Sequence, residues 1–250
     1  MYNIKIDAGS PDRRLETGLT GGYRSWGRGM VGKRATRSVW AGAIFLAVIG
    51  VAAAFRRTLV LLWPQRFAGK FPAAAALDAG FARHPVLTLL HIILGALFVI
   101  LALLQFAPRI RARHLTFHRW SGRFLVATGI LIGISALVMS YTTAIGGANE
   151  TAATTLFAIL FLFCLIKSYR HIRRKEVAQH REWMIRVFGI ALGVATTRPI
   201  VGIFFAFRRL TPHEFFGIAF WLGFSLTLLG AEAWINFTRG RAARNTSAEP

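Results

Sequence analysis

The sequence predicts an all-α integral membrane protein, a polytopic bundle of six membrane-spanning helices. Three observations predict this fold class. Of the 250 residues, 54% are hydrophobic and only 16% are charged, whereas a typical soluble domain is about 25% charged. The apolar residues gather in runs close to the ~20 residues that a helix needs to cross a bilayer. The basic residues outnumber the acidic ones by 31 to 10, and they lie mostly between those runs.

The same composition excludes other classes of protein. A disulfide scaffold is excluded because Cys164 is the only cysteine. Disorder over most of the chain is excluded because disordered segments are poor in apolar residues. The positive charge does not predict nucleic-acid binding, because it is divided among short segments instead of covering a polar surface with aromatic residues. We therefore expect the lipid bilayer, and no nucleic acid, as a partner.

Each expected span is a nearly uninterrupted apolar run. The first has a poorly marked end, because Arg56 and Arg57 follow its apolar residues, and the fourth is short. Spans two to five form the expected four-helix core. The spans are Val39 to about Phe55, with an extension to Trp63 left open, then Pro85–Ala107, Trp120–Thr142, Thr151–Ile166, Met184–Phe207 and Glu214–Ile235.

The two ends of the chain lie outside the six-helix transmembrane domain, which we place at residues 39–235. Residues 1–38 are rich in Gly and Arg and contain no apolar core, so they predict a disordered basic cytoplasmic tail instead of a cleavable signal. Residues 236–250 predict a second cytoplasmic tail for the same reason.

The distribution of Lys and Arg predicts the orientation of the spans. With the N-terminus inside, 23 of the 31 Lys and Arg residues fall on the inner side and eight on the outer side. Because basic loops stay in the cytoplasm, we expect a multi-pass protein of the bacterial cytoplasmic (inner) membrane with both termini in the cytoplasm. An odd number of spans would place the basic C-terminal segment on the wrong side.

The second span carries His91, an ionisable residue at membrane depth. Such residues mark functional sites by default, because an unpaired charge in lipid is costly. His84, Gly95 and Gln105 fall on the same helical face as His91. That face predicts contact with other helices instead of lipid. His91 is therefore either a ligand or proton site, or the centre of one interhelical hydrogen bond.

The third and fifth spans each begin with a histidine in a basic cluster, His118 and His180. The two spans run in the same direction, so both imidazoles lie at a similar depth near the inner side. That arrangement is typical of the two axial ligands of a b-type haem. Gly122, Gly129 and Gly133 share the face of His118 and would leave room for a flat cofactor.

Four arginines near these histidines are candidates for binding haem propionates, because a planar guanidinium matches a carboxylate. The same side chains are equally suited to anionic lipid head groups. They are Arg119, Arg123, Arg181 and Arg186.

Arg198 lies in the outer part of the fifth span, directly before Pro199. A proline inside a helix removes a backbone hydrogen bond, and an arginine at membrane depth needs a partner. Glu150, at the outer end of span four, is the first candidate for that partner. Glu232, near the inner end of span six, is expected to pair with one of the interfacial arginines.

Three motifs together resemble a bacterial membrane protein family described as domain of unknown function 2306. They are HIILGALFVILALLQF from His91, HRWSGR at His118–Arg123 and HREWMIR at His180–Arg186, followed by TTRP around Arg198. The resemblance covers roughly residues 85–205, which are four spans. It implies a membrane protein and no particular catalytic activity.

A looser likeness is to the cytochrome b561 type of four-helix haem core. In that type, histidines pair between the first and third core helices and between the second and fourth. His118 and His180 match the second-with-fourth pair, and His91 matches the first-helix position. The partner expected for His91 is missing, because residues 151–166 contain no histidine.

The sequence leaves two functions open. The first is a redox protein that holds a b-type haem between spans three and five and exchanges electrons with a quinone or another redox partner. The second is a binding, transport or structural membrane protein without a cofactor. In that case His91, Arg198 and the interfacial arginines hold a lipid head group, an anion or a proton pathway. Whether the protein is an enzyme stays open in both.

Overall fold

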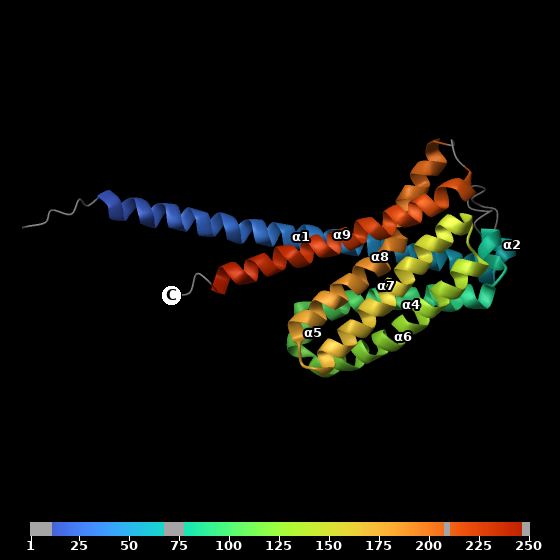
Figure 1. The fold of residues 1–250 in the computed structure, drawn as a ribbon, viewed down its shortest axis with the longest axis horizontal. Helices are drawn as coiled ribbons and strands as arrows, with labels where there is room; N and C mark the ends of the chain where they lie inside the picture. Colours follow the sequence, from blue (N-terminus) through green and yellow to red (C-terminus); the bar gives the residue numbers. More distant parts are fainter. Residues whose placement is uncertain (1–11, 68–77, 208–210, 247–250) are drawn as a thin grey trace, which may run out of the picture. The chain divides into compact units, whose positions relative to one another are not determined.

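The computed structural model describes residues 12–67, 78–207 and 211–246, and they form helices joined by short turns (Figure 1). Six helices among them are long and apolar enough to cross a membrane. This confirms the all-α bundle of six spans. The helices are α1 (Asp12–Leu62), α2 (Pro64–Phe67), α4 (Pro85–Phe106), α5 (Pro108–Arg113), α6 (Leu115–Thr142), α7 (Gly147–Arg173), α8 (Val177–Phe207) and α9 (Pro212–Thr246).

Most predicted spans are shorter than the helices that contain them. Helix α4 agrees closely, because Pro85 begins it and Pro108 follows its end. Helix α7 continues from the predicted limit at Ile166 to Arg173. The difference has a physical reason: hydropathy marks only the part of a helix that lies in lipid, whereas its backbone hydrogen bonds continue into water.

Parts of both expected cytoplasmic tails are helical within the described residues. Helix α1 already begins at Asp12, and α9 continues to Thr246. Neither stretch contains a proline inside the helix, and both contain Arg and Ala, which favour helix. Residues 1–11 and 247–250 of the predicted tails lie outside the described residues. The chain divides into two compact units between Ile44 and Phe45, within α1. The second unit contains the rest of α1, from Phe45 onward, and all the later helices.

Four helices of the second unit form a ring (Figure 1). Helix α4 packs on α6, α6 packs on α7, and α7 packs on α8, while a smaller contact joins α8 to α4. Helices α6 and α8 therefore lie at opposite corners of the ring. Helix α9 packs along α8 and also contacts α7. The buried core of the ring includes Phe98, Leu125, Phe161, Leu165 and Val187.

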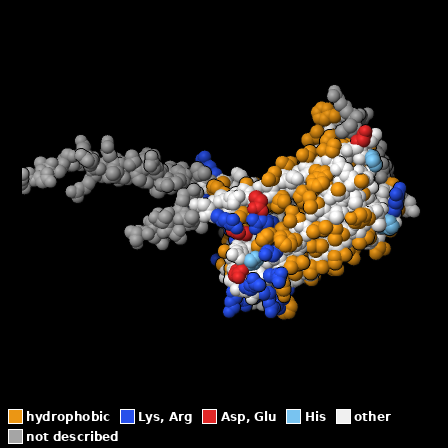
Figure 2. Space-filling model, viewed as in Figure 1, with side chains coloured by type: hydrophobic (Ala, Val, Ile, Leu, Met, Phe, Trp, Pro, Cys, Tyr) orange, Lys and Arg blue, Asp and Glu red, His pale blue; other side chains and the backbone are white. Residues whose placement is uncertain are grey.

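The outer surface of the bundle is apolar over a broad belt, and Lys and Arg gather at one end of it (Figure 2). We call this the basic end; it contains α5 and the turn between α7 and α8. Exposed residues of the belt include Phe124, Ile134, Leu156 and Ile159. Because soluble monomers rarely expose so continuous an apolar surface, the belt is the surface that faces lipid.

Glycines let α8 and α9 approach closely. A Cβ atom on Gly193 would collide with the ring of Phe224, and one on Gly223 would lie 2.7 Å from Cγ2 of Thr197. Small residues at helix contacts allow this backbone approach in membranes. By contrast, a Cβ on Gly230, also in α9, would meet nothing within 4 Å.

We expect Gly193→Ala to destabilise the protein by about 1–3 kcal/mol, because the added methyl group overpacks the contact with Phe224. Gly230→Ala is the matched control and should be neutral or slightly stabilising, because alanine favours helix. Thermal unfolding in detergent measures both. Equal melting temperatures for the two variants would contradict the close contact of α8 with α9.

Candidate functional site

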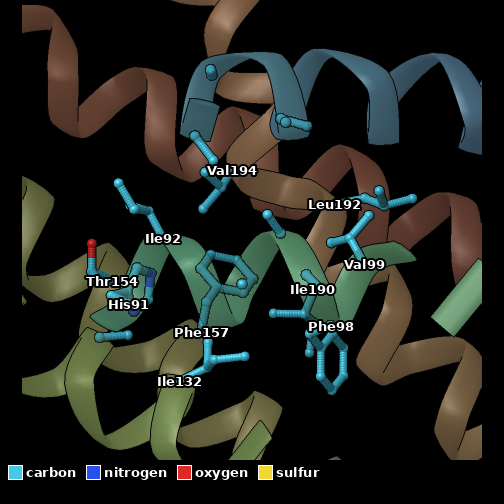
Figure 3. Close-up of a pocket in the computed structure, with 18 of the residues that line it drawn as sticks. His91, Ile92, Phe98, Val99, Ile132, Thr154, Phe157, Ile190, Leu192 and Val194 are labelled. Atoms are coloured by element: carbon cyan, nitrogen blue, oxygen red, sulfur yellow. The ribbon is translucent and has the colours of Figure 1, made fainter. Parts of the chain in front are cut away.

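A cavity of about 210 Å³ lies within the bundle, between α1 and the ring of helices (Figure 3). Most of its wall is apolar and includes Ile92, Phe98, Val99 and Phe157. Small residues leave the space open. A Cβ added to Gly95, for example, would meet nothing within 4 Å. Helix α1 contributes further small residues to the wall, namely Ala47, Gly50, Ala53 and Ala54.

Charged residues line the cavity at the end opposite the basic end. They are Arg57 from α1, Glu150 from α7 and Arg198 from α8. Arg198 Nε is buried and has no hydrogen-bond partner in the part of the chain that the structure describes. An unsatisfied guanidinium nitrogen inside a protein is unusual, because its desolvation is not compensated.

Glu150 lines the same cavity but does not pair directly with Arg198 among the described residues. Its Oε2 atom accepts hydrogen bonds from the backbone N–H groups of Ile145 (2.7 Å) and Gly146 (2.6 Å). The carboxylate therefore holds the turn before α7. It still attracts Arg198 electrostatically. The expected pairing of these two residues is therefore a longer-range attraction without direct contact between the charged groups.

A second charged group includes Arg57, which lines this end of the cavity. The guanidinium of Arg56 donates to both carboxylate oxygens of Asp78, at 3.1 and 2.8 Å. Arg57 forms an ion pair with the same carboxylate and lies over the ring of Phe81, with Cζ 4.4 Å from the ring centre. Together with Arg198 and Glu150, three guanidinium groups face two carboxylates. This end therefore carries an excess of positive charge.

His91 lines the deeper part of the cavity and also bonds to α6. Its Nδ1 atom lies 2.9 Å from Ser135 Oγ, and Ser135 Oγ donates to the carbonyl oxygen of Ile132 at 3.0 Å. On the same face of α4, the amide nitrogen of Gln105 donates to Ser121 Oγ at 2.5 Å. The predicted polar stripe of α4 thus faces α6, and the interhelical hydrogen bond expected as one interpretation of His91 is formed.

His118 and His180 lie on α6 and α8, at opposite corners of the ring, near the basic end. His180 Nδ1 lies 3.0 Å from the carbonyl oxygen of Ser168 and 2.8 Å from its Oγ. The backbone carbonyl of His118 accepts a hydrogen bond from Gln105 at 3.1 Å. Neither histidine lines the cavity described above.

The predicted glycine face of α6 is partly filled by side chains. A Cβ on Gly129 would lie 2.8 Å from a methyl group of Leu165, and one on Gly133 would collide with Leu162. At Gly122, nearest to His118, the closest atom is Gln105 Oε1 at 3.8 Å. Gly129 and Gly133 therefore pack α7, and only Gly122 leaves space beside it.

The four interfacial arginines have different environments. Arg186 forms the pair expected for Glu232, with Nε to Oε1 at 2.5 Å and Nη2 to Oε2 at 2.9 Å. Arg119 and Arg123 are exposed, and Arg123 lies over the ring of Trp120 at 4.9 Å. Arg181 is half-buried.

Sequence reasoning missed Asp78, Ser135 and Ser168. Asp78 had a detectable signal, because it is the only acidic residue between Glu16 and Glu150. The two serines had none, because a serine in an apolar span is common and its partner depends on helix packing.

Comparison with curated proteins finds no match, and comparison with solved structures finds none either. The model of one protein family matches residues 88–235, from α4 to α9. This match extends through the sixth span, beyond residues 85–205, which carried the resemblance in sequence. The chain belongs to this family, which is described as predicted membrane protein (DUF2306).

Proposed function

We propose that this integral membrane protein binds an amphiphile with an anionic head group. The observation that carries the proposal is the buried Nε atom of Arg198, which has no hydrogen-bond partner among the described residues and lies at the charged end of an apolar cavity. An anionic oxygen would supply the missing acceptor. The apolar wall would surround the tail of the same molecule.

The chemistry of the charged end supports an anion. A guanidinium group presents several donors in one plane and matches carboxylate and phosphate oxygens. Two of the three arginines at this end already share Asp78, and Glu150 is engaged by backbone N–H groups. Among the described arginines at this end, Arg198 is the one without an ion pair to a carboxylate.

The structure of α1 supports entry of a ligand from the bilayer. From Phe45 onward, this helix buries only Ala47, Arg57 and Val60. It therefore forms a thin wall between the cavity and lipid. An amphiphile could reach the cavity beside α1 without crossing water, while its head group stays near the membrane surface.

We propose that the membrane is the bacterial cytoplasmic membrane and that the basic end faces the cytoplasm, as the positive-inside rule predicts. Arg198 then lies toward the outer leaflet, which would supply the ligand. Exposed Arg119 and Arg123, beside Trp120 at the other end, are suited to anionic head groups of the inner leaflet.

We expect Arg198→Met to weaken binding of an anionic amphiphile strongly. A saturated fatty acid should raise the melting temperature of the wild-type protein in detergent, whereas the alcohol of the same chain length should not. In the variant, affinity for the acid should fall by roughly 10- to 100-fold, because a charged hydrogen bond is lost. Without ligand, the variant should be at least as stable as the wild type, because no unsatisfied buried charge remains.

Arg119→Met is the matched control, because this arginine is exposed at the basic end. The affinity of this variant for the fatty acid should equal that of the wild type. Gly95→Leu tests the cavity itself, because the new side chain enters open space, whereas Gly230→Leu adds the same atoms outside the cavity. Binding that survives both Arg198→Met and Gly95→Leu would rule out this site.

We expect labelling of single cysteines to establish the orientation. In a Cys164→Ala background, Thr211→Cys places a thiol between α8 and α9, and Arg174→Cys places one in the turn between α7 and α8; both positions are exposed. A membrane-impermeant maleimide added to intact cells should label only the first. Labelling of Arg174→Cys alone would reverse the orientation.

A second candidate function is favoured by one observation at His180. Because the carbonyl oxygen of Ser168 can only accept, Nδ1 of His180 donates to it, which leaves the lone pair on Nε2. Metal-binding histidines in proteins usually make this kind of hydrogen bond. We therefore propose, as the alternative, that His180 and His118 hold a b-type haem near Gly122; a bound haem would supply one-electron transfer.

We expect protein purified after haem-supplemented expression to show a Soret band if this alternative is right. The band should disappear in a His118→Ala/His180→Ala double variant and persist in His213→Ala, which changes a histidine at the opposite end. Absence of the band in the wild type, or its persistence in the double variant, would eliminate the alternative.

A further inference from the structure

We infer, on the basis of the proposed function, that the anionic amphiphile carries a hydroxyl group within its apolar part and that His91 Nε2 accepts a hydrogen bond from it. His91 lies in the wall of the same cavity, beyond the charged end. The ligand class is therefore a hydroxylated, fatty-acid-like anion and not a plain acyl chain.

The bonds of Ser135 determine which nitrogen of His91 carries the proton. Ser135 Oγ donates its single proton to the carbonyl oxygen of Ile132, so it accepts from Nδ1 of His91. A neutral imidazole with a protonated Nδ1 has its lone pair on Nε2. Within the described part of the chain, the imidazole bonds to Ser135 Oγ and to the backbone of Ile132.

The surroundings of His91 make this acceptor selective. Figure 3 shows the imidazole among labelled cavity residues that are mostly apolar, such as Ile92 on the same helix, Ile132 and Phe157. An apolar chain placed here would remove water from Nε2 and leave it without a donor. Sites of this kind discriminate strongly against ligands that lack the hydroxyl group.

The helices set the spacing between the two polar groups of the ligand. Near the charged end, Ser140 of α6 contacts α7, because Ser140 Oγ lies 3.2 Å from Thr155 Oγ1. The hydroxyl group of Thr151, the residue that follows Glu150, donates to the carbonyl oxygen of Ser140. Ser135, the partner of His91, lies five residues deeper along α6. At 1.5 Å per residue, His91 is therefore roughly 7 Å deeper than that level. A mid-chain hydroxyl group, not one next to the head group, fits this spacing.

The test compares two ligands that differ in one oxygen atom: a saturated fatty acid and the same acid with a mid-chain hydroxyl group. The wild type in detergent should bind the hydroxy acid roughly tenfold more tightly. His91→Leu should remove this preference while it retains binding of the plain acid. Ser135→Ala should weaken the preference, because the Nδ1 proton is no longer held, and it keeps the test valid if His91→Leu does not fold.

Each outcome decides the question. Equal affinity of the wild type for the two acids, with both lost in Arg198→Met, would overturn the role of His91 and leave the proposed function intact. A preference that persists in both His91→Leu and Ser135→Ala would also overturn it. If the wild type binds neither acid, the proposed function and this inference both fail.

Discussion

The structure depends on one constraint: an arginine inside a membrane protein must find oxygen atoms to bind. Arg198 lies on a membrane-spanning helix, and its Nε atom is buried without a protein acceptor among the described residues. The nearby carboxylates are already engaged, Asp78 by two arginines and Glu150 by the turn before α7. A cation that the fold leaves unsatisfied in this way is costly unless something else completes it. The proposed anionic ligand would supply the missing acceptor, and its apolar part would occupy the cavity beside Arg198.

The packing of the helices explains why the cavity lies where it does. Helices α8 and α9 meet through Gly193 and Gly223, and α6 and α7 meet through Gly129 and Gly133, so these contacts are closely filled. The side of the ring that faces α1 is different, because Gly95 and several alanines leave space there. Close packing on one side and small residues on the other leave a mostly apolar space on the side of the ring that faces α1.

Much of the fold could be predicted from the sequence, because the cost of exposing backbone to lipid leaves helices as the simplest solution. Pro85 and Pro108 even mark the ends of α4. Hydropathy could not give the extensions of α1, α7 and α9, because it does not register helix that lies in water. At the site, His91 and Arg198 were recognisable as ionisable residues at membrane depth. Their partners were not, because the bonds of Ser135 and the engagement of Glu150 by a turn depend on how helices meet in space.

The most direct measurement of the central claim is native mass spectrometry of the protein released from detergent micelles. We expect an added mass on the wild-type protein that corresponds to a co-purified anionic amphiphile. That mass should be absent from Arg198→Met and present in Arg119→Met, purified in the same way. A wild-type protein that carries no such molecule, even after incubation with anionic lipids, would contradict the account. So would an Arg198→Met variant that carries the same molecule in the same amount.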